Sequence, residues 1–258
     1  MDLELKGKTA LVTGASKGIG LGVAESLATE GAHLHLAART EAALAEAKRR
    51  LEAQHGISVK IHPVDLSQSS AAKELAAVCA DVDILVNNAG AIPGGDIEAI
   101  NEEIWREAWE LKVFGYVNLT REFLRRMKAR GSGVILNVIG VAGERPDAGY
   151  IAGSAGNASL IAFTRALGSR SMDDGVRVLA VNPGSTGTDR IVQLFKTRAQ
   201  AQYGDESRWE EYLQKQPAGR TATVREVADT VAYLVSPRAS YISGTVVTVD
   251  GGLAGRAG

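Results

Sequence analysis

The stretch Thr9-Ala10-Leu11-Val12-Thr13-Gly14-Ala15-Ser16-Lys17-Gly18-Ile19-Gly20 decides the fold of this chain. Its first residues form the β-branched and apolar run of a buried strand, and its glycines come where a helix begins. Glycines at such a turn let the backbone approach a ligand closely, and the unpaired N–H groups of a helix N-terminus bind phosphate. This context predicts a dinucleotide site formed by Gly14, Ser16, Lys17, Gly18, Ile19 and Gly20.

Six further apolar or β-branched runs come after this stretch, at residues 33–37, 59–62, 84–86, 134–138, 176–181 and 245–249. Helix-forming segments such as Glu41 to Gln54 lie between them. Strand–helix alternation predicts a doubly wound α/β protein, with helices on both faces of a parallel sheet. The absence of a linker or repeat favours one domain over 1–258. The polar, helix-prone segment 189–219 interrupts the alternation, and we expect it to be a lid over the ligand crevice.

Composition excludes several classes of function. Of the 258 residues, 45% are hydrophobic and 23% charged, and the formal net charge is -1. Because there is no basic tract, neither nucleic acid nor an anionic membrane is an expected partner. The first six residues lack the apolar core of a signal peptide, and no apolar run approaches membrane-spanning length. With a single cysteine, Cys79, the chain is expected to be cytoplasmic.

Motifs from about residue 9 to 252 make the chain resemble the short-chain dehydrogenase/reductase family. They are Thr13-Gly14-x3-Gly18-x-Gly20, Asp65, Asn87-Asn88-Ala89-Gly90, Asn182-Pro183-Gly184-x3-Thr188, Pro217-x-Gly219-Arg220 and Asp250-Gly251-Gly252. The resemblance implies a seven-stranded Rossmann fold, assembled into a homodimer or homotetramer, that acts on a small-molecule substrate. It also implies cofactor contacts from Asp65, Leu66, Asn88, Ala89, Gly90, Asn157, Pro183, Gly184, Thr186 and Thr188.

The residues after the second strand indicate which dinucleotide binds. An acid there would pair with a ribose 2′-hydroxyl and repel a 2′-phosphate, but this chain has Ala38-Arg39-Thr40. Arg39 can donate a fork of hydrogen bonds to phosphate oxygens, and Lys17 adds a second positive charge. The alternative is that Arg39 stacks on adenine and Lys17 is solvated. The charges favour NADP(H) over NAD.

The family's catalytic positions are where the resemblance fails. Its standard branch uses Asn, Ser, Tyr and Lys, and no Tyr-x3-Lys occurs near the expected helix. Residues 158–167 match the helical segment that comes directly after the family's Lys. By this alignment the four positions hold Lys112, Gly140, Gly153 and Asn157.

Three interpretations of this divergence stay open. The first is an oxidoreductase for a small carbonyl, alcohol or conjugated substrate, with Tyr150 as proton donor, Lys112 as its electrostatic partner and Asn157 as a ribose ligand. The second is a different reaction on a bound dinucleotide, in which Gly140, Gly153 and Gly156 leave room for a bulkier substrate; these glycines could instead only permit tight helix packing. The third is a catalytically inactive NADP(H)-binding protein, a redox sensor or partner subunit. We favour the first.

Each assignment has a simpler structural alternative. Tyr150 could only pack at a helix start, and Lys112 could only pair with Glu110 or Glu144. His33 and His35 fall on one face of a strand, but no acid or thiol lies near them in the sequence. We therefore expect core histidines and no metal site.

Overall fold

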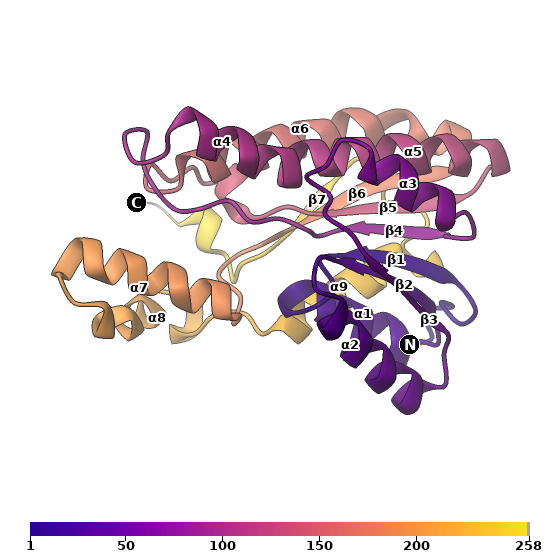
Figure 1. The fold of residues 1–258 in the computed structure, drawn as a ribbon, viewed down its shortest axis with the longest axis horizontal. Helices are drawn as coiled ribbons and strands as arrows, with labels where there is room; N and C mark the ends of the chain where they lie inside the picture. Colours follow the sequence, from indigo (N-terminus) through magenta and orange to yellow (C-terminus); the bar gives the residue numbers. More distant parts are fainter. Residues whose placement is uncertain (257–258) are drawn as a thin grey trace.

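The sheet has seven parallel strands in the order β3-β2-β1-β4-β5-β6-β7, in a computed structural model that describes residues 1–256 (Figure 1). The strands are β1 (Thr9–Thr13), β2 (His33–Ala38), β3 (Val59–Pro63), β4 (Ile84–Asn87), β5 (Gly133–Val138), β6 (Val176–Pro183) and β7 (Val246–Val249). Strand order reverses between β1 and β4, which defines the doubly wound Rossmann topology. The predicted fold class is confirmed.

The described residues form α-helices, most of which cover the two faces of this sheet. They are α1 (Gly18–Thr29), α2 (Glu41–His55), α3 (Ala71–Val78), α4 (Glu102–Trp109), α5 (Gly115–Arg130), α6 (Ile151–Ser171), α7 (Asp189–Tyr203), α8 (Glu211–Gln214) and α9 (Val224–Val235). Helices α1, α2 and α9 lie on one face, and α3, α5 and α6 on the other (Figure 1).

Alternation along β1 shows why its residues form a central strand. Ala10 and Val12 pack into the core under α1, α2 and α9, whereas Leu11 between them packs under α3 and α5. Successive side chains of a strand point to opposite faces, so a run that is apolar throughout is buried on both sides. All three residues are fully buried.

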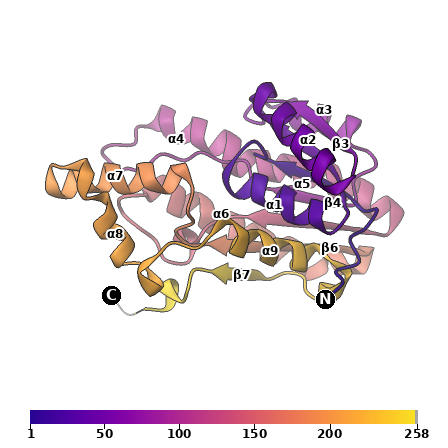
Figure 2. The ribbon, with the colours of Figure 1, turned by 90° about the horizontal axis from the view of Figure 1, so that it is seen from below.

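The segment 189–219 stands apart from the two helical layers. Helices α7 and α8 extend to one side of the sheet in both views (Figures 1 and 2). Phe195 of α7 is buried, and its ring stacks on that of Tyr212 in α8 with centroids 5.5 Å apart. Of the helices in residues 1–256, none combines the length and apolar character needed to cross a bilayer.

Candidate active site

The glycine turn after β1 forms a cradle open to a ligand. Gly14 and Gly18 have φ values of +64° and +57°, which favour glycine. Asn88 fixes the turn, because its side-chain Nδ2 donates to the Thr13 carbonyl at 2.9 Å and its backbone N–H donates to Thr13 Oγ1 at 2.9 Å. A Cβ on Gly20 would lie 2.4 Å from the Gly14 carbonyl oxygen. The close-packed backbone at the start of α1 therefore fits a pyrophosphate.

A crevice runs from this turn to the segment 189–219, along the carboxyl ends of the strands, where ligands of open α/β sheets bind. The predicted site residues that line it are Gly14, Ser16, Lys17, Gly18, Ile19, Arg39, Leu66, Asn88, Ala89, Gly90, Lys112, Tyr150, Asn157, Pro183, Gly184, Thr186 and Thr188. The structure therefore brings residues from most of the chain's length to one surface.

Two predicted cofactor residues, Gly20 and Asp65, lie outside that lining. Gly20 faces the Gly14 carbonyl and the Asn88 amide, so it supports the turn from behind. The Asp65 carboxylate accepts hydrogen bonds from the Ser67 N–H at 3.0 Å and from the Ser67 hydroxyl at 2.8 Å. These bonds, chiefly the backbone one, lower the pKa of Asp65 and hold its side chain within its own turn.

The surface of the crevice is positively charged near the end of β2, where the adenosine of a dinucleotide would lie. Arg39 directly follows β2 and is exposed, and Lys17 caps α1. The acid that lines this part of the crevice, Glu25, is paired with Arg50 of α2. Arg39 and Lys17 therefore present cations to the space where a 2′-phosphate would lie.

Tyr150 stands at the N-terminus of α6, with its hydroxyl bound to Arg190 rather than to Lys112. The Arg190 Nη2 donates to the Tyr150 hydroxyl at 3.1 Å. Burial raises the pKa of Tyr150, and the Arg190 guanidinium opposes that rise. The expected electrostatic partnership of Tyr150 with Lys112 is corrected in this respect, because the cation that reaches the phenol comes from α7.

Lys112 is buried in a π-helical turn, Glu110–Phe114, between α4 and α5. Its Nζ donates to the carbonyls of Val138 at 2.7 Å and Ile139 at 3.2 Å, and to the Tyr116 hydroxyl at 3.0 Å. The burial, with a smaller contribution from Arg190, lowers the pKa of Lys112 to about 7. π-Helical turns of this kind occur frequently at functional sites.

The alternative in which Lys112 pairs with Glu110 or Glu144 is wrong. The Nζ of Lys112 is occupied by carbonyl and hydroxyl oxygens. The Glu144 carboxylate instead accepts from Thr248 Oγ1 at 2.8 Å. Lys112 thus has an interior role at the floor of the crevice and is not part of a surface ion pair.

Neighbouring side chains lie close against the glycines at two of the divergent positions. A Cβ on Gly153 would lie 2.0 Å from Tyr150 Cε1, so the tyrosine ring occupies the space that a side chain there would take. At Gly140 the same position is 2.9 Å from Asn157 Nδ2. Tyr150 and Asn157 thus take part of the space beside these two glycines, but Gly140 still lines the crevice, and their interpretation as substrate space stays a prediction.

Asn157 lines the crevice with an unused acceptor. Its side chain is 4% exposed, and its Oδ1 has no hydrogen-bond partner within residues 1–256. A buried carbonyl oxygen without a donor is costly, so a ligand hydroxyl would satisfy it. This orphaned atom fits a cofactor ribose beside α6.

Arg190 is the site residue that sequence reasoning missed. Besides Tyr150 it binds the carbonyls of Gly90 at 3.1 Å and Ile92 at 2.8 Å, and so ties α7 to the loop after β4. Its position is forty residues after Tyr150, inside the polar segment predicted as a lid. A single arginine in a polar helix belongs to no sequence motif, so its place in the site becomes visible only in the folded structure.

Comparison with known proteins gives a consistent result. The family model described as short chain dehydrogenase matches residues 8–199. A 3-oxoacyl-(acyl-carrier-protein) reductase of Vibrio cholerae is 35% identical over 252 residues, covering 97% of this chain and 99% of that protein. The structure of L-sorbose reductase from Gluconobacter frateurii, complexed with NADPH and L-sorbose, superposes with a TM-score of 0.90 at 33% identity over all of both chains. An actinorhodin polyketide ketoreductase with NADPH gives a TM-score of 0.91 at 30% identity, covering 97% of this chain and 98% of that one.

Proposed function

Because the chain belongs to the short-chain dehydrogenase family, we propose that it is an NADP(H)-dependent oxidoreductase with an atypical active site. Its substrate class is a small carbonyl, its alcohol, or a conjugated compound. One observation carries the proposal: a single crevice has a phosphate cradle at one end and, at the other, a half-buried phenol whose hydroxyl accepts a hydrogen bond from an arginine.

Charge and structural likeness both favour NADP(H). Arg39 and Lys17 offer cations where an NAD-specific protein would offer an acid. The L-sorbose reductase and the polyketide ketoreductase, which share this fold, were solved with NADPH. Asn157 Oδ1 and the glycine turn would hold the ribose and the pyrophosphate.

Within this proposal Tyr150 is the proton donor. When NADP(H) is bound, it would supply hydride chemistry at the substrate carbon. The Tyr150 O–H gives its proton to the substrate oxygen, or to the second carbon of a conjugated substrate. Arg190 then stabilises the phenolate, because its guanidinium lies 3.1 Å from that oxygen. Positioned acids of this kind contribute about 10²–10⁴-fold in rate.

Lys112 acts at the same site, but away from the Tyr150 hydroxyl. Its Nζ donates to the carbonyls of Val138, the last residue of β5, and of Ile139, just before Gly140. The Lys112 amine therefore lies beneath the crevice. Its pKa of about 7 places it where it gains or loses a proton near neutral pH. Together Tyr150, Arg190, Lys112 and Asn157 would replace the standard tetrad, whose positions hold Lys112, Gly140, Gly153 and Asn157 in this chain.

The test is turnover of NADPH with a panel of substrates. The purified chain is mixed with NADPH and with L-sorbose, 3-oxoacyl thioesters, other small ketones and enones, and the loss of nicotinamide absorbance is measured. Turnover of at least one class supports the proposal. Tight NADPH binding without turnover over the whole panel would contradict it and favour an inactive binding protein.

We further propose that the enzyme assembles into a homodimer or homotetramer, as the family resemblance implies. Sedimentation equilibrium should then give a mass of two or four times 27.1 kDa. A single species at the monomer mass would contradict this.

A further inference from the structure

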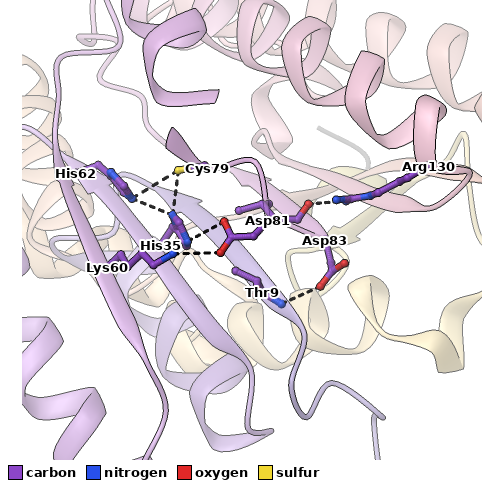
Figure 3. Close-up of polar contacts among 9 residues, drawn as sticks. Thr9, His35, Lys60, His62, Cys79, Asp81, Asp83 and Arg130 are labelled. Atoms are coloured by element: carbon purple, nitrogen blue, oxygen red, sulfur yellow. Dashed lines mark hydrogen bonds and ion pairs between the residues drawn. The ribbon is translucent and has the colours of Figure 1, made fainter. Parts of the chain in front are cut away.

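A second cluster of chemically active side chains lies away from the crevice. His35 of β2, His62 of β3 and Cys79 at the end of α3 point toward one another (Figure 3). His35 and Cys79 are buried and His62 is half-buried. The three residues stand outside the set of described residues that line the crevice. The cluster is thus separate from the proposed oxidoreductase site.

Sheet register explains why the two histidines meet. His62 pairs with Ala37 of β2, two residues beyond His35, so the two imidazoles project from the same face of neighbouring strands. Their rings stack with centroids 5.0 Å apart. Helix α3 covers this face and brings the Cys79 thiol down onto them.

The three donor atoms form a compact triangle. His35 Nδ1 lies 2.9 Å from His62 Nε2 and 3.0 Å from Cys79 Sγ, and the third side, Sγ to Nε2, is 3.5 Å. A tetrahedral zinc ion with two nitrogen ligands and one sulfur ligand needs about 3.3 Å between the nitrogens and about 3.6 Å between the sulfur and each nitrogen, given its bond lengths. His35 Nδ1 would have to move about half an ångström away from the other two donor atoms, which already lie close to the required separation.

An outer carboxylate orients the first histidine. The other nitrogen of His35, Nε2, lies 3.3 Å from Asp81 Oδ1, and Asp81 Oδ2 also binds the Lys60 ammonium at 3.1 Å (Figure 3). His35 Nε2 makes no hydrogen bond within residues 1–256, so Asp81 acts on it by charge and favours the tautomer in which Nε2 carries the proton and the Nδ1 lone pair faces the triangle. Histidines that bind metals almost always donate their other ring N–H to a carboxylate, a backbone carbonyl or water.

We propose that His35 Nδ1, His62 Nε2 and Cys79 Sγ form a binding site for a thiophilic divalent metal ion of the Zn²⁺ type, with water as the fourth ligand. Two imidazoles and one thiolate suit a borderline-soft cation and disfavour Mg²⁺ or Ca²⁺. On binding, the thiol S–H bond breaks, its proton passes to solvent, and a sulfur–metal bond forms with no change in oxidation state. The ion would clamp β2, β3 and α3 together.

Cobalt(II) tests the site, because a thiolate ligand gives Co²⁺ an intense charge-transfer band in the near ultraviolet. The chain has a single cysteine, so such a band can come from Cys79 alone. Untagged, metal-free protein is titrated with Co²⁺ and then with Zn²⁺. One equivalent of Co²⁺ per chain should produce the band, and Zn²⁺ should abolish it. Absence of the band in the wild-type protein would overturn the proposal and leave a hydrogen-bonded core cluster.

Variants locate the ligands. Cys79→Ser should abolish the band, and His62→Gln should weaken Zn²⁺ binding at least tenfold, whereas His55→Gln on α2 is the matched control and should change neither. Asp81→Asn, which removes only the outer carboxylate, should weaken Zn²⁺ binding by about 10–100-fold. Unchanged affinity in His62→Gln would also overturn the site. NADPH binding by each variant reports that it has folded and separates this result from any failure of the oxidoreductase proposal.

Discussion

The hydroxyl of Tyr150 has the environment of a tuned acid, with burial raising its pKa and Arg190 bound to its oxygen. We expect Tyr150→Phe to lower kcat by about 10²–10⁴-fold, because only the donated proton is lost. The NADPH dissociation constant should stay unchanged. Tyr241→Phe, at a position 94% exposed, is the control. Full turnover in Tyr150→Phe would show that another group delivers the proton.

Lys112 should make stability depend on pH. Its folded pKa of about 7 lies below its usual 10.5, so between these values the unfolded chain binds more protons and stability rises with pH. Below pH 7 the buried charge costs on the order of 5 kcal/mol relative to the same charge in water. The unfolding free energy of Lys112→Met, relative to that of the wild type, should therefore be highest near pH 6, where the wild type carries the cost of the buried charge.

Urea unfolding at pH 6 and pH 10 measures this effect. The stability of Lys112→Met relative to wild type should be lower at pH 10 than at pH 6. Lys73→Met, at an exposed position on α3, is the control and should show no such trend. A difference that is constant with pH would mean that Lys112 has the same pKa in the folded and unfolded states.

Residues differ in how far the sequence alone could assign them. The sequence could place Arg39 and Tyr150 at the crevice, because one follows the second strand and the other precedes a helix, and their roles stay predictions. Arg190 could not be placed in this way, because its role depends on α7 folding back over the loop after β4. The cluster of His35, His62 and Cys79 was missed for the same reason, since three separate elements supply its atoms.

Among the helices and strands, the first turn of α6 depends on a residue without a side chain, Gly153. Gly153 leaves space for the Tyr150 ring, whose atoms would lie 2.0–2.6 Å from a Cβ. Gly153→Ala gains about 1 kcal/mol of intrinsic helix propensity, so a large loss of stability is not expected. The ring must move instead, and turnover should fall at least tenfold while NADPH binding persists.

The control for this prediction is Ala155→Ser, an exposed change on the same helix. Turnover and thermal unfolding are compared for the two variants. Wild-type turnover in Gly153→Ala would show that the position of the Tyr150 ring does not matter. A collapse of stability together with activity would instead mean that the ring cannot move and that the helix packing is rigid.

The strands could be predicted almost to the residue, and the irregular turns could not. The run 33–37 became β2 (His33–Ala38), because a short run in which leucines alternate with histidines ends at the polar Arg39 and Thr40. The π-helical turn at Glu110–Phe114 has no comparable signal. No local pattern in the sequence marks the extra residue per turn that joins α4 to α5 there.

For the whole molecule, the glycine turn and the strand alternation together define one crevice, and cofactor binding should therefore stabilise the entire domain. NADPH at a hundred times its dissociation constant adds about 2.7 kcal/mol. For a chain of this length that corresponds to a rise in Tm of roughly 5–10 °C. NADH at the same concentration should give a smaller rise, because it lacks the phosphate that Arg39 and Lys17 would bind.

Arg39→Ala shows whether that difference comes from the predicted charge. Losing hydrogen bonds to a charged group costs about 1.5–3 kcal/mol, so NADPH affinity should fall roughly 10–150-fold while NADH affinity is unchanged. Arg49→Ala, an exposed arginine on α2, is the control. Differential scanning fluorimetry with both nucleotides measures the shifts, and calorimetric titration gives the dissociation constants. Equal losses for NADPH and NADH would mean that Arg39 stacks on adenine, and a larger Tm rise with NADH in the wild type would reverse the assignment of the cofactor.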